Sequence, residues 1–172
     1  MSLDDNAVKP LDDKPSRPVQ GPRRLAAMMA LIPDSLIAAL GRFSIAAVFW
    51  KSGQTKVDGL AIDLINGEFH IGWPHLSYSA VALFRDEYRL PLIPPEWAAV
   101  MAASAEHVFS VLLLIGLATR LSALGLLLMT LVIQIFVYPD AYPIHGVWAT
   151  VLLYLMAKGA GKWSLDYLFL RQ

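Results

Sequence analysis

Four long apolar runs dominate the chain after its first 35 residues, and polar side chains are sparse within them. The runs cover residues 36–50, residues 97–117, residues 121–138, and a stretch from near His145 to Ala157 that Lys158 ends. A helix needs about 20 predominantly apolar residues to cross the hydrocarbon of a bilayer, and the second and third runs come close to that alone. The pattern therefore predicts an all-α membrane protein built as a bundle of four transmembrane helices.

The alternative is a soluble bundle with buried helices, and it stays open because the polar residues Glu106 and Gln134 interrupt the apolar runs. The composition of the chain distinguishes between these two classes of protein. The 172 residues are 56% hydrophobic and 16% charged, with a mean hydropathy of +0.52. Soluble domains are roughly 45–50% apolar and about 25% charged, so both values favour lipid as the solvent. The chain has no cysteine, which excludes disulfides, thiolate catalysis and thiolate-held iron–sulfur clusters. The net charge of zero gives no indication of a nucleic-acid partner.

Charged residues divide the chain and orient it. The first 24 residues hold four prolines, four aspartates and five basic residues, which predicts a disordered tail (1–24) before a transmembrane domain (25–172). Nine lysines and arginines fall before the first helix, between the second and third, and after the fourth. Four fall on the other side, namely Lys51, Lys56, Arg85 and Arg89. Because basic residues concentrate on the cytoplasmic side, we expect both termini to be cytoplasmic.

The extracytoplasmic loop between the first two helices carries its own structural signals. Two apolar stretches, residues 61–65 and 68–72, flank Asn66 and Gly67, which is a strong hairpin pattern. Residues 77–88 then predict a short helix, with Tyr78, Val81 and Phe84 at apolar spacing. We expect a structured cap over the outer mouth of the bundle, and a mobile loop is the alternative.

Polar groups inside the apolar runs are costly and are usually paired or functional. Arg42 lies near the middle of the first run and Glu106 near the middle of the second. Because neighbouring helices are antiparallel, we expect these two charges to face each other. Two interpretations stay open, a structural ion pair that fixes helix register and a part of a ligand or proton site. For the adjacent His107, a hydrogen-bonded packing role is favoured over ligand binding.

Two stripes of residues support a close contact between these helices. The stripe on the second helix consists of Ala99, Ala103, Glu106 and Ser110. The face of the first helix consists of Arg42, Ala46, Phe49, Gly53 and Lys56. Small residues let two helix backbones approach each other in a membrane, so we expect the stripes to pack together.

The outer mouth offers a second candidate site. Tyr138, Asp140, His145 and Trp148 lie where the third helix ends and the fourth begins. Lys51 and Lys56 lie at the end of the first helix. Gln134 lies about one turn below Tyr138. Aromatic walls with a few polar groups suit a quinone-like headgroup or a small anion, and an aromatic belt is the alternative. His107 is roughly 15 Å deep, at about 1.5 Å per residue, so one iron could not bind both it and His145. The histidine spacing matches no metal signature.

Several motifs, taken in order along residues 36–167, resemble the DoxX family. The first motif, in the first helix, consists of Arg42, Phe43 and Ser44, then Trp50 to Gly53 and Lys56. The second, in the loop, consists of Ala82, Leu83, Phe84, Glu87, Tyr88 and residues 91–95. The others consist of Ala105, Glu106 and His107 with residues 113–120 and Ala123, and of residues 136–139 with His145 and Trp148. The resemblance implies a four-helix protein of the bacterial inner membrane. It also implies a membrane partner of redox or detoxifying assemblies, since the family takes its name from a small subunit of a thiosulfate:quinone oxidoreductase.

The resemblance and the outer mouth together give the functional expectation. We expect a membrane subunit of an oxidoreductase assembly that meets quinone, with a protein partner or a second copy of the chain beside it. The alternative is a non-enzymatic protein, either a small-solute carrier or an anchor for a partner, because the sequence contains no cofactor motif. Whether the chain is itself catalytic stays open at this point.

Overall fold

The structure is a computed structural model, which describes residues 27–63 and 66–170. The chain divides into two compact units, residues 1–32 and 33–172. In the first unit, residues 27–29 form a helical turn. The predicted disordered tail, residues 1–24, lies outside the described residues. The second unit holds every other element.

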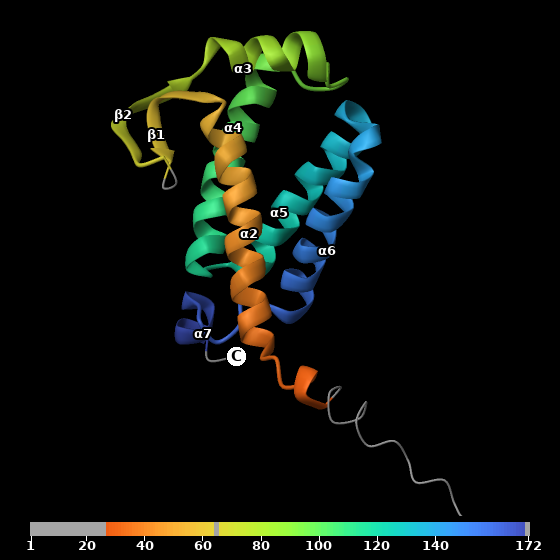
Figure 1. Cartoon of the computed structure of the whole chain (residues 1–172). Helices are drawn as coiled ribbons and strands as arrows, with labels where there is room; N and C mark the ends of the chain where they lie inside the picture. The colour runs from red at the N-terminus through yellow and green to blue at the C-terminus, as the bar shows by residue number, and fades with distance from the viewer. Residues whose placement is uncertain (1–26, 64–65, 171–172) are drawn as a thin grey trace, which may run out of the picture. The chain divides into compact units, whose positions relative to one another are not determined.

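Four long helices pack into a closed bundle (Figure 1). They are α2 (Asp34–Gln54), α4 (Pro95–Ile115), α5 (Thr119–Val132) with its π-helical continuation η2 (Ile133–Val137), and α6 (Tyr142–Lys158). Each helix packs against the next in the chain, and α6 returns to α2. The core between them centres on the fully buried Phe49, Leu113, Leu126, Leu152 and Leu155. The four predicted helices are present, with α6 beginning three residues before His145.

Three of the described helices, α2, α4 and α5 with η2, are long and apolar enough to cross a membrane. Their outward surfaces carry exposed apolar side chains such as Phe43, Val108 and Leu128, which suits contact with lipid tails. The fourth helix, α6, has 17 residues, which is short of the roughly 20 that a span needs. We call the end of the bundle where α2 ends and α4 begins the cap end, and the opposite end the base.

A two-stranded antiparallel sheet follows α2 and departs from the all-α prediction. Strands β1 (Val57–Asp63) and β2 (Glu68–Leu76) pair Leu60 with Ile71 and Ile62 with Phe69. The predicted hairpin around Asn66 and Gly67 is therefore confirmed, with longer strands than the pattern indicated. Gly59 has φ +85°, and a Cβ there would lie 2.4 Å from the carbonyl oxygen of Trp73. Only glycine fits where the two strands approach this closely.

The predicted cap is also present, as helix α3 (Tyr78–Leu83) and the π-helical turn η1 (Phe84–Tyr88). The Ser77 hydroxyl accepts a hydrogen bond from the backbone N–H of Ser79 at 3.2 Å and caps the start of α3. Phe84 packs on Ala98 and Ala99 of α4, so the cap is held against the end of the bundle (Figure 1). Tyr78, expected on the packing side, is instead 82% exposed.

The base is closed by two short connections. The α4–α5 turn passes through Gly116 and Ala118, both with positive φ, and leads directly into α5. Helix α7 (Leu165–Leu170) follows α6, and the Asp166 carboxylate accepts hydrogen bonds from the N–H groups of Ala118 and Thr119 at 2.7 and 2.9 Å. This carboxylate satisfies donors at the start of α5 that have no partner within the helix. At the cap end, the turn η3 (Pro139–Ala141) joins η2 to α6.

Candidate functional site

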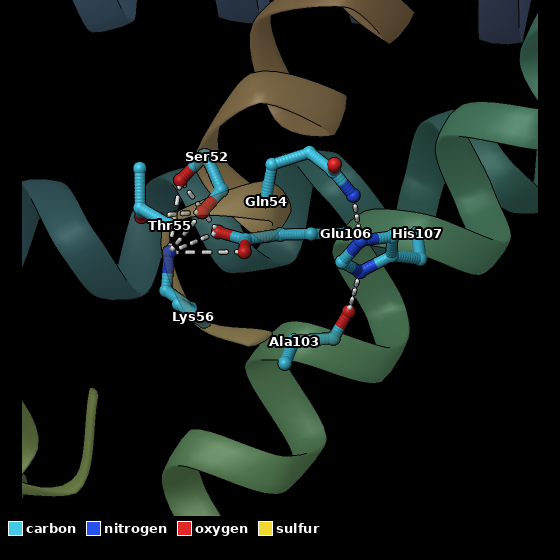
Figure 2. Close-up of polar contacts among 7 residues, drawn as sticks. All are labelled: Ser52, Gln54, Thr55, Lys56, Ala103, Glu106 and His107. Carbon is cyan, nitrogen blue, oxygen red and sulfur yellow. Dashed lines mark hydrogen bonds and ion pairs between the residues drawn. The ribbon is translucent and has the colours of Figure 1, made fainter. Parts of the chain in front are cut away.

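A buried ion pair joins Lys56 to Glu106 at the cap end (Figure 2). The ammonium nitrogen of Lys56 lies 3.0 Å from Oε1 and 2.9 Å from Oε2 of Glu106. The two side chains are only 5% and 2% exposed. Ser52 completes the cluster, since its hydroxyl donates to Glu106 Oε1 at 2.9 Å and accepts from Lys56 at 2.9 Å. The carboxylate therefore has a counter-ion in Lys56 and a hydrogen-bond donor in Ser52, as a charge in a low-dielectric interior requires.

The predicted pairing of Arg42 with Glu106 is wrong. The guanidinium of Arg42 donates to the carbonyls of Leu113 at 3.1 Å and Leu114 at 3.0 Å, about two turns of α4 beyond Glu106. The prediction assumed that the centres of both apolar runs lie at the same depth. In the structure α4 is shifted along α2 towards the cap end, so Glu106 lies level with the end of α2.

Arg42 instead holds the base of the bundle together. Besides the two carbonyls at the end of α4, its guanidinium donates to the carbonyl of Trp163, in the segment that follows α6. The last carbonyls of a helix have no partner within it, and a cation there also meets the negative end of the helix dipole. These contacts favour the structural interpretation of Arg42 over the ligand-binding one.

The ring of His107 is fixed by two hydrogen bonds (Figure 2). Its Nδ1 donates to the carbonyl of Ala103 at 2.7 Å, and its Nε2 faces the side-chain amide of Gln54 at 2.9 Å. Because a carbonyl can only accept, Nε2 is the acceptor from Gln54. The amide oxygen of Gln54 accepts in turn from the backbone N–H of Ile62 at 2.8 Å. The geometry agrees with the packing role expected for His107 and also ties β1 to the bundle.

The close approach of α2 and α4 at this level depends on a glycine. A Cβ at Gly53 would lie 2.7 Å from the His107 ring and 3.2 Å from the Cβ of Glu106. The two predicted stripes are therefore confirmed as the packing surfaces. Every residue of both stripes is buried: on α4 these are Ala99, Ala103, Glu106 and Ser110, and on the facing side they are Arg42, Ala46, Phe49 and Gly53 of α2 with Lys56 just after it.

A cavity of about 210 Å³ adjoins the ion pair. Its walls come from α4, from α5 with η2, and from the cap. The apolar lining consists of Phe84, Leu90, Ile93, Ala98, Met101, Ala102, Ala105, Met129, Val132, Ile133 and Val137. The polar lining consists of Ser52, Lys56, Glu106 and Tyr88. Both π-helical turns contribute to the wall, and such turns are frequent at functional sites.

Gln134, His145 and Trp148 form a separate cluster between α5 and α6. Nδ1 of His145 lies 2.7 Å from Oε1 of Gln134, and the Gln134 amide nitrogen donates to the carbonyl of Pro139 at 2.6 Å. The ring of His145 lies 5.1 Å from that of Trp148. These three side chains do not line the cavity, so the predicted outer-mouth site divides into two parts.

Tyr138 connects the cap to the end of α5. Its hydroxyl donates to the carboxylate of Glu87, and the centre of its ring lies 5.8 Å from that of Tyr88, with the two rings nearly perpendicular. The bond to Glu87 raises the pKa of Tyr138, and burial raises the pKa of Tyr88. Both phenols therefore stay protonated and able to donate near neutral pH.

The remaining predicted residues, Lys51 and Asp140, are exposed and belong to neither cluster. Sequence reasoning missed Ser52, Glu87 and the apolar lining of the cavity. The spacing of Ser52 and Lys56, four residues apart, was the one available signal, since it places them on the same side of a helix.

Among residues 27–63 and 66–170, no three histidines or carboxylates lie together as a group that could hold a metal ion.

Comparison with known proteins gives one family. The model of the DoxX family matches residues 37–139, which run from α2 into η3. An uncharacterized protein of Haemophilus influenzae is 30% identical over 135 residues, which cover 74% of this chain and 79% of that protein. No solved structure matches. The residues matched by the family model include the ion pair, both strands of the hairpin, the cap and the whole cavity lining.

Proposed function

The chain belongs to the DoxX family of membrane proteins, and on this premise we propose that it is a membrane subunit of an oxidoreductase assembly that binds a quinone headgroup. The headgroup would lie in the cavity of about 210 Å³ beside Lys56 and Glu106. The observation that carries the proposal is an apolar cavity with a buried ion pair in its wall.

The chemistry of this wall matches both redox states of a quinone. A quinone has an apolar ring with two carbonyl acceptors, and a hydroquinone has two hydroxyl donors. Lys56 would donate to a carbonyl, and Glu106 would accept from a hydroxyl. Most ligand sites are roughly 300–1,000 Å³, so this smaller cavity fits a headgroup while the isoprenoid tail stays among lipid chains.

The proposed role of this chain is to bind and orient the ring. Reduction of a quinone to a hydroquinone takes up two electrons and two protons. In this proposal a partner subunit that carries a redox cofactor supplies the electrons, and water at the cap end supplies the protons. This chain has no cysteine, so it does not itself hold a thiolate-bound cluster. Lys56 and Glu106 would together hold one oxygen of the ring, as carbonyl or as hydroxyl.

A substitution that fills the cavity tests the binding site. Ala105 lines the cavity, whereas its neighbour Ser104 is exposed on α4. We expect Ala105→Leu to weaken binding of a short-chain ubiquinone at least about tenfold, equivalent to about 1.4 kcal/mol. Ser104→Leu adds a similar side chain outside the cavity and should bind as the wild type does. Binding is measured by tryptophan quenching on the purified protein in nanodiscs.

Two other outcomes would contradict the proposal. Equal binding by both variants would place quinone elsewhere on the protein. An absence of binding by the wild type would favour the rival functions, a small-solute carrier or an anchor. Uptake into sealed vesicles, or a partner that co-purifies, would then distinguish between those two.

We also propose that the protein lies in a bacterial inner membrane, with both termini in the cytoplasm and α6 as a fourth span. The nine-to-four distribution of basic residues supports this orientation. The packing of α6 against both α2 and α5 supports the fourth crossing. A 17-residue helix can cross if the bilayer thins locally around it.

The absence of native cysteine makes the topology directly measurable. Glu68 in β2 and Lys162 after α6 are both exposed. We expect Glu68→Cys to react with a membrane-impermeant maleimide on intact spheroplasts, and Lys162→Cys to react only after permeabilisation. Reaction of both without permeabilisation would show that α6 does not cross, and the reverse pattern would invert the orientation.

A further inference from the structure

The β1–β2 hairpin has one apolar face and one polar face. Side chains of directly paired residues project to the same side of a sheet. The pairs Leu60–Ile71 and Ile62–Phe69 are all apolar. The next pairs along the strands, Ala61–His70 and Asp63–Glu68, project to the opposite side and carry the charged and polar groups.

The apolar face is strongly exposed on β2. Phe69 is 63% exposed, Ile71 is 81% exposed and the nearby Trp73 is 89% exposed. A contiguous exposed apolar patch marks a surface that another molecule or a membrane covers.

Hydrogen bonds to α2 set the position of this patch. The carbonyl of Ile62 accepts from the indole N–H of Trp50 at 3.1 Å, and its N–H donates to Gln54 at 2.8 Å. Trp50 and Gln54 belong to the last two turns of α2, so the strand that leaves this helix folds back beside it. Figure 1 shows the hairpin next to the cap end of α2, with β2 on its outer side.

We propose that the hairpin lies in the headgroup region of the bilayer at the cap end and inserts Phe69, Ile71 and Trp73 towards the hydrocarbon. The strand that pairs with β2 is hydrogen-bonded to the last two turns of α2, a helix long and apolar enough to span, so the patch is held at one end of a helix that lipid would surround. Tryptophan favours this interface, which suits the most exposed of the three side chains.

The same location suits the rest of the hairpin. Within the described part of the chain, no further strand pairs with the outer edge of β2, and its backbone groups can be satisfied by water and headgroups at a shallow depth but not by hydrocarbon. Glu68 and His70 project away from the apolar face, towards water. Gln54 also bonds to His107, so the membrane contact would help to hold the ring beside Glu106. The proposal does not depend on quinone binding.

Spin labels on alternate residues of β2 test the insertion. Single cysteines replace Phe69 and Ile71 on the apolar face, and Glu68 and His70 serve as controls on the polar face. The labelled protein is reconstituted alone in phosphatidylcholine vesicles, and collision with oxygen and with a water-soluble nickel chelate is measured. We expect residues 69 and 71 to favour oxygen, with nickel collision several-fold lower than at residues 68 and 70.

Two results would overturn the proposal. Equal nickel collision on both faces would show that the hairpin is in water. Low collision with both reagents at residues 69 and 71 would show that protein, a second copy of this chain, covers the face. Trp73→Phe provides a second measurement without labels, because it should reduce the quenching of total tryptophan fluorescence by shallowly brominated lipids. Unchanged quenching would also count against insertion.

Discussion

Replacing Lys56 with methionine is expected to lower the free energy of unfolding by about 3–5 kcal/mol. The substitution keeps the length of the side chain but leaves the buried carboxylate of Glu106 without its counter-ion. Ser52 would remain as a hydroxyl donor to that carboxylate. The expected loss is large because a charge in a low-dielectric site has no water to replace the lost partner. Reversible unfolding in mixed micelles, followed by circular dichroism, measures it.

Two further variants separate charge burial from the loss of any lysine. Lys51 is exposed near the same end of α2, so Lys51→Met should change stability by no more than about 0.5 kcal/mol. The double variant Lys56→Met/Glu106→Met should recover most of the lost stability, because removing both buried charges together is often neutral. If Lys56→Met behaved like Lys51→Met, the ion pair would contribute nothing to the fold.

The second large effect is expected at the base of the bundle. Arg42→Met removes a guanidinium that donates to three carbonyls, those of Leu113, Leu114 and Trp163. Hydrogen bonds from charged groups contribute about 1.5–3 kcal/mol each to the free energy of unfolding. The variant no longer buries a charge, and the desolvation penalty that it avoids offsets part of the lost hydrogen-bond energy. We therefore expect a net loss of about 3 kcal/mol in the same unfolding measurement.

A matched arginine and a conservative change accompany this prediction. Arg85 forms an exposed ion pair with Glu96 at 3.1 Å, and Arg85→Met should cost less than about 1 kcal/mol. Arg42→Lys should be nearly as damaging as Arg42→Met, because a single ammonium cannot reproduce the planar fork that reaches three carbonyls. Equal stability of the Arg42 and Arg85 variants would contradict the structural role of Arg42.

The sequence predicted most of the local structure because local patterns determine it. Apolar runs gave the four helices, and Asn66 with Gly67 gave the hairpin. The small-residue stripe through Ala99 and Ala103 gave the packing surface of α4. Each of these features depends on residues close together in the chain.

The candidate site was less predictable because it depends on the register of α4 against α2, that is, on how far one helix is offset along the other. The predicted face of the first helix carries two cations, Arg42 and Lys56, and the prediction pairs Glu106 with Arg42 because Arg42 lies nearer the centre of the apolar run. Lys56 follows the end of α2 and resembles an ordinary interfacial lysine. Gly53 held the better indication of register, since the closest approach of two helices needs a residue without a side chain.

The cavity itself had no sequence signal. Its walls combine the cap, α4 and η2, which are far apart in the chain, and its lining residues resemble any lipid-facing or core residue. The outer-mouth prediction grouped Tyr138 and His145 with Lys56 because all three fall near one end of the bundle. In the structure the His145 cluster lies between α5 and α6, and only Lys56 reaches the cavity.

The most direct test of the quinone site is to identify which small molecules the protein holds when it is purified from its own membrane. Wild type and the double variant Lys56→Met/Glu106→Met are extracted in mild detergent, and their bound small molecules are identified by mass spectrometry. We expect a quinone in near-stoichiometric amount with the wild type and little with the folded double variant. Equal amounts of quinone in both preparations, or none in the wild type, would contradict a headgroup site at Lys56 and Glu106.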